Sequence, residues 1–234
     1  MRVIDFHSHI LPELDDGSKN VETSFAMYKE SCNQGIEIII ATPHFYASKD
    51  RIDDFLIKRT KAYEKIARLP IENGPKILLG AEVAWFDGIS KAEKVEKLSI
   101  EGTKLLLLEL PFETWSRSMI TELGVLTKKY HIVLAHLERY LKLPGNKAYI
   151  EELLRLPLTV QVNAGSLADW KQRRQILKMF KNGQAQVLGS DCHGMNHRPP
   201  NLMAGREVIR RKLGTEFLEK IDTAGNRLLE ESRD

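Results

Sequence analysis

Histidine and carboxylate side chains recur along this 234-residue chain where short apolar runs end. Eight of them are candidates for chemistry: His7, His9, His44, Glu82, Glu109, His136, Asp191 and His193. Five of the seven histidines belong to this set, although chance placement would scatter them. Neutral imidazole and carboxylate are ligands for zinc, manganese and iron, and bridging carboxylates let two or three ions share a site. The pattern predicts a metal cluster with hydrolytic chemistry.

The individual signals differ in strength. His7 and His9 are two residues apart, so on a strand both imidazoles face the same way and can reach one ion, but a structural histidine pair is about as common. Glu82 and Glu109 follow strongly apolar runs, and an ionised glutamate at the mouth of a buried strand is unfavourable unless it is paired or bound to metal. A salt bridge would explain either glutamate alone. Recurrence at several run ends favours metal ions.

The runs that precede these residues have the length and composition of buried strands, and segments with helical spacing lie between them. The predicted strands are Arg2–Phe6, Ile36–Thr42, Lys76–Glu82, Lys104–Leu110, His131–His136, Thr159–Asn163 and Gln186–Asp191. The predicted helices are Lys19–Gln34, Ile52–Leu69 (ending at Pro70), Ser116–Tyr130, Lys147–Leu156, Asp169–Lys181, Leu202–Lys212 and Thr215–Glu231, with a weaker one at Lys91–Leu98.

Strands that alternate with helices predict parallel β/α units. Seven units fit a distorted TIM-like (β/α)7 barrel better than an open doubly wound sheet. Such barrels carry their catalytic groups at the carboxyl ends of the strands, which is where the candidate ligands fall. No composition shift or linker divides the chain, so a single α/β domain over residues 1–234 is expected.

Composition excludes several other classes of protein. The formal net charge of +3 gives little reason to expect nucleic acid or a membrane surface as partner. No apolar stretch approaches the ~20 residues that span a bilayer, and Asp5 and His7 interrupt any signal-peptide core near the start. Two cysteines, Cys32 and Cys192, provide no disulfide framework. A cytoplasmic protein without membrane insertion is expected, and homo-oligomerisation stays open.

Several short motifs resemble one known superfamily. His7-Ser8-His9, Leu14-Asp15-Asp16-Gly17, Ala41-Thr42-Pro43-His44 and Gly80-Ala81-Glu82 resemble the polymerase and histidinol phosphatase (PHP) superfamily. Ala135–Tyr140, Gln161-Val162-Asn163 and Ser190-Asp191-Cys192-His193 with Arg198-Pro199-Pro200 are similar to its protein-tyrosine phosphatases from bacterial capsule and exopolysaccharide operons. The motifs keep their order from His7 to Pro200.

The resemblance implies a distorted (β/α)7 barrel with three metal ions, usually manganese, although iron and zinc use the same ligands. One ion would be held by His7, His9, Glu82 and Asp191, a second by Glu82, Glu109 and His136, and a third by Asp16, His44 and His193. Local sequence predicts only a turn at Asp15-Asp16-Gly17, so the choice of Asp16 over Asp15 comes from the resemblance. The implied substrate is a phosphotyrosyl protein, an autophosphorylating bacterial tyrosine kinase that controls polysaccharide export.

Two arginines are candidates for phosphate binding. Arg139 lies three residues after His136 and Arg198 five residues after His193, both in predicted loops over the strand ends. A guanidinium presents a planar fork that matches phosphate oxygens. In the resembling phosphatases, arginines at these motif positions hold the phosphate and assist the transition state, while a hydroxide bridging two ions attacks phosphorus without a covalent enzyme intermediate.

Other chemistries remain to be weighed. Cys192 to Arg198 spells Cys-x5-Arg, as in cysteine-dependent tyrosine phosphatases, but Pro199-Pro200 follows where those enzymes begin a helix. Three other functions are alternatives to a tyrosine phosphatase. A histidinol-phosphate phosphatase would use the same metals, and a polymerase-linked nuclease would need a stripe of basic residues. A metal-stabilised regulatory module would have the metal site but no catalytic turnover. Aromatic residues beside the predicted ligands, Phe45-Tyr46 and Trp85-Phe86, either stack on a substrate ring or only form the wall of the site.

Overall fold

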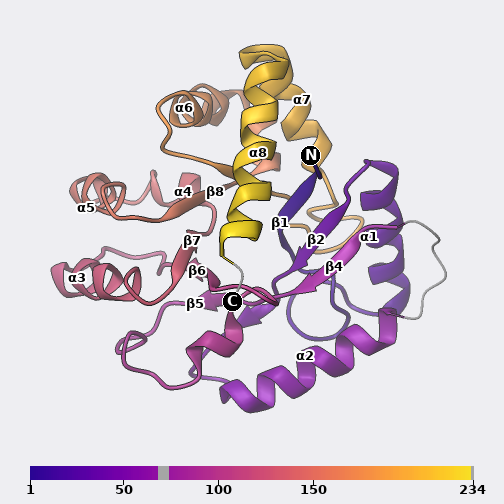
Figure 1. Ribbon diagram of the computed structural model, residues 1–234, viewed down its shortest axis with the longest axis horizontal. Coiled ribbons are helices and arrows are strands. Elements are labelled where there is room, and N and C mark those ends of the chain that lie inside the picture. The colour runs from indigo at the N-terminus through magenta and orange to yellow at the C-terminus, as the bar shows by residue number, and fades with distance from the viewer. Residues whose placement is uncertain (68–73, 233–234) are drawn as a thin grey trace.

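The computed structural model describes residues 1–67 and 74–232 as one α/β barrel of parallel strands surrounded by helices (Figure 1). The strands are β1 (Ile4–Ser8), β2 (Ile38–Ala41), β3 (His44–Phe45), β4 (Lys76–Leu79), β5 (Glu82–Ala84), β6 (Leu105–Glu109), β7 (His131–Leu134), β8 (Thr159–Asn163) and β9 (Val187–Gly189). They occupy all seven of the predicted strand regions. The expected end of the second helix, at Leu69 and Pro70, lies outside the described residues.

The parallel pairing runs around a circle. One sheet has the order β1-β2-β4 and the other the order β3-β5-β6-β7-β8-β9. The last strand returns to the first, because Asp191 N donates to His7 O (2.8 Å), His9 N donates to Cys192 O (3.0 Å), and Ser8 and Cys192 form a parallel bridge. The distorted (β/α)7 barrel predicted from the sequence is confirmed.

Two of the seven predicted strands are broken rather than continuous. The run Ile36–Thr42 ends as β2 and resumes as β3 after Thr42-Pro43, since proline has no N–H for a ladder hydrogen bond. The run Lys76–Glu82 ends as β4 and resumes as β5, with Gly80 N donating to Ala41 O (2.8 Å) at the break. The two breaks lie side by side, and beyond them His44 pairs with Glu82.

Helices cover the outside of the sheet and follow the strands in sequence. They are α1 (Val21–Asn33), α2 (Ile52–Ile66), η1 (Val95–Leu98), α3 (Arg117–Leu126), α4 (Leu137–Tyr140), α5 (Lys147–Leu153), η2 (Ala164–Leu167), α6 (Trp170–Lys181), α7 (Leu202–Leu213) and α8 (Thr215–Glu231). No helix among the described residues is long and apolar enough to cross a bilayer.

The helix predictions differ from the structure mainly at their ends. The predicted helix Ser116–Tyr130 ends at Leu126 and continues only as turns, in which Lys129 N and Tyr130 N donate to Leu126 O. The predicted helix Lys147–Leu156 ends at Leu153. The single turns α4 and η2 were not predicted, because four residues carry too little periodicity to be distinguished from a loop.

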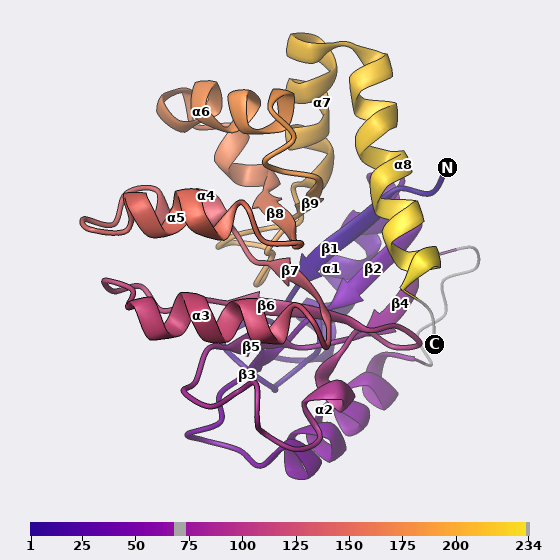
Figure 2. The same ribbon diagram turned by 60° about the vertical axis from the view of Figure 1, so that its left-hand side comes forward.

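Alternate strand residues fill the barrel interior. This inner cluster joins strands that are not neighbours in the sheet, namely Ile4 and Phe6 of β1, Leu105 and Leu107 of β6 and Val133 of β7, with Leu228 and Leu229 of α8. Helix α8 therefore lies against the amino-terminal end of the barrel (Figure 2), where Ser232 O accepts from Lys104 N (2.8 Å). Apolar packing at this end leaves the opposite, carboxyl-terminal end for polar groups.

Candidate metal centre

An irregularity in β1 turns the two histidines of His7-Ser8-His9 toward the other strand ends. Asp5 pairs with Ile39 and Ser8 pairs with Ala41, so β1 advances three residues while β2 advances two. An extra residue of this kind reverses the side on which the following side chains lie. Ser8 then faces outward with Ala41, and His7 and His9, both fully buried, face the barrel axis.

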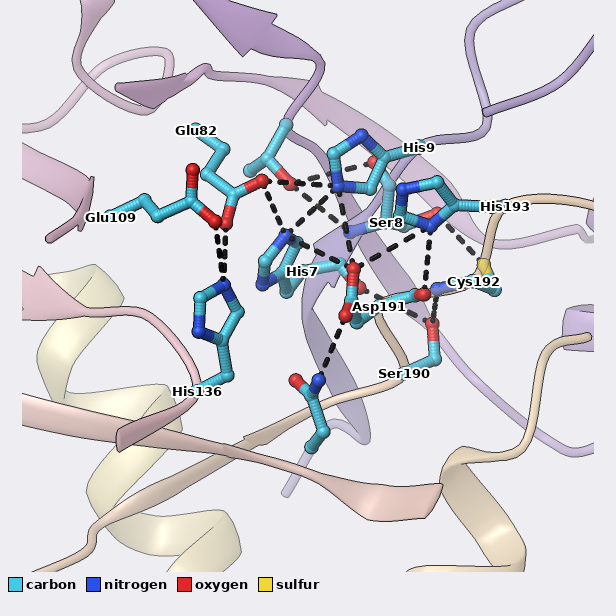
Figure 3. A network of polar contacts seen from close by, with 12 residues as sticks. His7, Ser8, His9, Glu82, Glu109, His136, Ser190, Asp191, Cys192 and His193 are labelled. Atoms are coloured by element: carbon cyan, nitrogen blue, oxygen red, sulfur yellow. Dashed lines mark hydrogen bonds and ion pairs between the residues drawn. The ribbon is translucent and has the colours of Figure 1, made fainter. Parts of the chain in front are cut away.

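Six strand regions and the loop that carries Asp16 bring the predicted ligands into one cluster (Figure 3). Four groups of donor atoms lie within 4.8 Å of one another: His9, Asp16, His44 and His193; His7, Glu82 and His136; His7, His9 and Asp191; and His44, Glu82 and Glu109. All nine predicted metal ligands belong to at least one group. Glu82 is the most shared carboxylate, with Oε2 3.2 Å from His7 Nε2 and Oε1 2.9 Å from His136 Nε2.

The backbone at two of these positions is strained. His136 and Asp191 have φ angles of 33° and 51°, in the left-handed region that residues with a Cβ seldom adopt. Such conformations persist where surrounding contacts enforce them, and they concentrate at functional sites. Each residue lies two positions beyond the end of its strand, Leu134 of β7 or Gly189 of β9, so the chain turns sharply while the side chain stays directed at the cluster.

Three buried side chains support the predicted ligands from behind, two of them at histidines and one at Asp191. Asp15 Oδ2 lies 2.6 Å from His9 Nδ1, and Gln161 Oε1 lies 3.2 Å from His7 Nδ1. In each imidazole the Nδ1 atom is thereby occupied and Nε2 points into the cluster, which is the arrangement expected of metal-binding histidines. Asn163 Nδ2 donates to Asp191 Oδ2 at 2.8 Å.

The two aspartates of the Asp15-Asp16-Gly17 turn have different positions. Asp16 is exposed, and its Oδ1 lies 3.5 Å from Nε2 of both His44 and His193. Asp15 is buried behind His9 and also accepts from His44 N (2.9 Å). Gly17 is required beside them because a Cβ there would lie 2.4 Å from His9 Cβ. The structure thus brings the predicted ligand Asp16 into the cluster and gives Asp15 a supporting position.

The protein alone does not balance the charges or complete the hydrogen bonds of the clustered side chains. Burial raises and the neighbouring histidines lower the pKa of Glu82, which ends well below its usual value. Burial lowers the pKa of His9, but hydrogen bonds to Asp15 and Glu82 raise it to about 10. His44 Nδ1 and His193 Nε2 are buried without a well-directed hydrogen bond, and each faces a carboxylate, Glu82 Oε2 at 3.0 Å and Asp16 Oδ1 at 3.5 Å. Buried carboxylates that face imidazole nitrogens in this way fit bound cations.

Both predicted arginines reach the same end of the cluster. Arg139 Nη2 donates to Asp191 Oδ2, and Arg198 Nη1 donates to the same oxygen at 3.2 Å. Arg198 Nη2 also lies 3.6 Å from Asp16 Oδ2. The guanidinium groups line a cavity of about 460 Å³ together with Glu82 and Glu109. Two guanidinium groups thus border the carboxylates of the cluster, an arrangement that matches the oxygens of a phosphate ester.

Cys192 is unsuited to the alternative role of nucleophile. Its Sγ lies 3.2 Å from Ser8 Oγ and the side chain is buried. Burial and the nearby Asp5 carboxylate raise the pKa of the thiol to about 12, so no thiolate forms at neutral pH. Figure 3 shows its sulfur at the edge of the network, away from the centre where the carboxylates meet the imidazoles.

Sequence reasoning assigned no role to four residues near the site: Asp15, Gln161, Asn163 and Phe112. Gln161 and Asn163 carry a usable signal, because they occupy alternate positions of a fully buried strand where apolar residues are expected. Of the aromatic pairs noted in the sequence, Tyr46 and Trp85 line the cavity. Phe45 is buried in the core with an edge-on contact to Phe55, and Phe86 packs against the same core.

A parallel α/β barrel with histidines and carboxylates gathered at the strand ends defines the class of metal-dependent barrel hydrolases. Within that class the chain belongs to the family described as capsular polysaccharide synthesis, CpsB/CapC, whose model matches residues 3–229.

Named relatives lie within the same family. The chain is 30% identical to the tyrosine-protein phosphatase CpsB of Streptococcus agalactiae serotype III (strain NEM316), over 92% of each chain. It is 29% identical to CpsB of Streptococcus pneumoniae, over 94% of each chain. It is also 29% identical to the tyrosine-protein phosphatase YwqE of Bacillus subtilis (strain 168), over 92% of this chain and 87% of YwqE.

Solved structures give the same family and fold. A chain from the crystal structures of YwqE and CpsB, described as unique metal-dependent tyrosine phosphatases, superposes with a TM-score of 0.79 at 25% identity, over 97% of this chain and 94% of that one. The phosphotriesterase homology protein of Escherichia coli has a TM-score of 0.58 at 10% identity, over 97% and 98%. The second match supports the barrel fold alone.

Proposed function

We propose that this protein is a metal-dependent protein-tyrosine phosphatase, a single domain over residues 1–234, whose ligands are the nine clustered His, Asp and Glu residues. The observation that carries the proposal is that the cluster and two guanidinium groups border one cavity of about 460 Å³. Metal ligands and phosphate-binding forks together suit a phosphate monoester. The tyrosine phosphatases among the relatives support phosphotyrosine as the substrate class.

Each group has a role that follows from its position. Arg139 and Arg198 are held by one carboxylate oxygen of Asp191, so both forks are oriented before substrate arrives. Their N–H groups donate to phosphoryl oxygens as negative charge redistributes in the transition state. His7, His9 and the shared Glu82 would hold metal, with Nδ1 of the histidines occupied by Gln161 and Asp15.

Bound divalent ions at such a cluster supply a nucleophilic water at neutral pH and neutralise phosphoryl charge. The leaving group needs little general-acid catalysis from the protein, because a phenol with pKa ~10 departs far more readily than an alkyl alcohol. His193, Asp191 or a bound water would be the proton donor, and the sequence does not distinguish among them. Of the metals that share these ligands, manganese is our first candidate, ahead of iron and zinc.

The protein substrate we propose is an autophosphorylating bacterial tyrosine kinase that regulates capsule or exopolysaccharide synthesis. The family description and the capsule-linked phosphatase names of the relatives support that context. We also propose the cytoplasm as the place of action.

Metal analysis of the purified protein, combined with a phosphotyrosyl-peptide assay with and without chelator, tests the proposal. We expect hydrolysis that disappears after chelation and returns when manganese is restored. The double variant His7→Ala/His9→Ala should lose metal and activity together while keeping its circular dichroism spectrum. Faster turnover of histidinol phosphate at equal metal loading would favour a small-molecule phosphatase, and no turnover of p-nitrophenyl phosphate would indicate a regulatory module.

A further inference from the structure

The wall of the cavity beside the metal centre has two chemical kinds of side chain. Its lining includes the polar groups of Glu82, Glu109 and the two arginines, and also three aromatic side chains, Tyr46, Trp85 and Phe112. A phosphate group matches the arginines, but its binding gives no reason for the aromatic part of the lining.

Phe112 is the most exposed of these aromatic residues. Half of its surface (50%) is accessible, although large apolar side chains are normally covered. One side of its ring is held by other rings: it stacks on His136 with centroids 5.8 Å apart and an interplanar angle of 22°, and it packs on Tyr140 at 5.1 Å. Since His136 is a proposed ligand, the ring extends directly from the edge of the metal centre.

The loop that carries Phe112 is fixed on both sides. Before it, Leu110 N donates to Tyr140 Oη at 2.9 Å. After it, Trp115 N donates to Asn146 Oδ1 at 2.8 Å, and Trp115 Nε1 donates back to Pro111 O at 2.9 Å. An exposed ring on an anchored loop is preorganised, so a ligand that packs on it loses little additional entropy.

Tyr46 is oriented by its neighbours at the same cavity. Its ring lies 5.2 Å from the ring of His44 and below Lys49 Nζ, which is 4.3 Å from the ring centroid. Tyr46 and Phe112 therefore each lie beside an imidazole of the cluster, His44 and His136 respectively, on the wall of the same cavity.

On the basis of the proposed phosphatase function, we infer that Phe112, with Tyr46 and Trp85, forms an aryl subsite that selects phosphate esters of phenols over those of alkyl alcohols. A phosphotyrosine side chain carries its ring one ester oxygen away from phosphorus, so a phosphate bound by the arginines keeps the ring within the same cavity, where the aromatic side chains lie. Aromatic pairs are worth roughly 0.5–1.5 kcal/mol beyond the area that they bury. A serine or threonine ester would leave Phe112 exposed.

Binding of two unreactive probes to the metal-loaded protein tests the subsite without relying on turnover. Benzylphosphonate carries an aryl ring and ethylphosphonate does not. In the variant Phe112→Ala we expect benzylphosphonate affinity, measured by titration calorimetry, to fall roughly 5- to 20-fold and ethylphosphonate affinity to stay within about twofold. Phe112→Leu should give an intermediate loss. The control Trp170→Ala removes another exposed aromatic side chain (74%) outside the cavity lining and should change neither affinity.

Each other result overturns the inference. Equal weakening of both probes would mean that Phe112 acts through the His136 ligand rather than through a substrate ring, and metal analysis would show the accompanying loss. No weakening of either probe, or no binding of either probe to the wild type, would equally refute the subsite. The proposed function fails separately, if the wild type shows no metal-dependent hydrolysis of a phosphotyrosyl peptide.

Discussion

Asp15 and His9 form the shortest of the supporting contacts that hold imidazoles in the metal centre, with Oδ2 2.6 Å from Nδ1. Burial raises the pKa of Asp15, but the hydrogen bond and charge of His9 lower it to about 2. The aspartate is therefore ionised over the whole neutral range. It fixes His9 with Nδ1–H directed at the carboxylate and Nε2 directed into the cluster. The orientation of one predicted ligand therefore depends on a residue that is not itself a predicted ligand.

Replacing Asp15 should weaken metal binding without unfolding the barrel. For Asp15→Ala we expect metal affinity to fall by roughly 10- to 100-fold, the usual effect of removing a carboxylate behind a metal-bound histidine. The measurement is metal titration of the chelator-treated protein, followed by activity at saturating manganese. Recovery of activity at high metal distinguishes an orienting role from loss of the fold.

A matched control for that variant is Asp87→Asn, which changes an exposed acidic residue outside the cluster. It should bind metal like the wild type. If Asp15→Ala also retains wild-type affinity, Asp15 does not orient His9, and the close contact is only a local feature of the turn.

Gln161 supports the fold as well as the site. Its Oε1 accepts from His136 N (2.9 Å) and contacts His7 Nδ1, and its Nε2 donates to Asn163 Oδ1 (2.9 Å). Gln161→Met keeps the volume but leaves these buried groups unpaired, so we expect the free energy of unfolding to fall by roughly 1–3 kcal/mol. Urea denaturation of the metal-free protein measures this change apart from any change in metal affinity.

The exposed Gln175 on α6 provides the comparison, because Gln175→Met removes no buried partner and should change stability by less than about 0.5 kcal/mol. If the two variants have the same free energy of unfolding, the hydrogen bonds of the Gln161 amide do not contribute to the stability of the fold.

The sequence predicts the barrel because each strand region is a buried apolar run and each intervening segment has helical spacing. It also places the eight strand-end ligands, since parallel strands bring their carboxyl ends together. The sequence does not predict the extra residue in β1 or the breaks at Thr42-Pro43 and Gly80-Ala81. The extra residue depends on register between strands that are distant along the chain, and register has no local signature. The two breaks did have a local signal, the proline at 43 and the glycine at 80, which the strand prediction did not use.

The same limit explains what was missed at the site. Asp15 and Asp16 are neighbours of one type in one turn, and only the fold places one behind His9 and the other facing His193. Phe112 lies three residues beyond Glu109 in a stretch without periodicity, so only the folded loop places it on His136. Local sequence patterns show which strand or helix carries a functional residue. Which residues from different loops contact each other is known only from the three-dimensional structure.

Metal binding should release protons, because the metal-free cluster holds extra ones. The pKa of His136, lowered by burial but raised by Glu109 and Glu82, is about 9, and that of His9 is about 10. Both imidazoles are charged at pH 7 in the metal-free protein, yet they must be neutral to bind a cation. Metal affinity should therefore rise with pH from 7 to 10. Calorimetry in two buffers with different protonation enthalpies measures the protons released, about two at pH 7.

The stability of the metal-free protein should change in the opposite direction. Both folded-state pKa values lie above the unfolded value of ~6.5, so these groups stabilise the fold below that pH and lose their contribution as pH rises through about 9 to 10. Urea unfolding at pH 7 and pH 10 with chelator present measures the loss. A metal-free protein that is equally stable at both values would contradict the assigned protonation.

Cys192 and Arg198 distinguish metal-dependent hydrolysis from a cysteine mechanism, because the two mechanisms need different members of the Cys-x5-Arg stretch. The buried thiol, with its pKa raised to about 12, contacts Ser8 rather than the cavity, so Cys192→Ala should retain activity and thiol alkylation should not inhibit. Arg198→Lys keeps the charge but loses the planar fork. We expect kcat/KM for a phosphotyrosyl peptide to fall roughly 10²- to 10³-fold, as when a preorganised donor to the transition state is removed. Loss of activity in Cys192→Ala at full metal content would instead establish the thiol as the nucleophile.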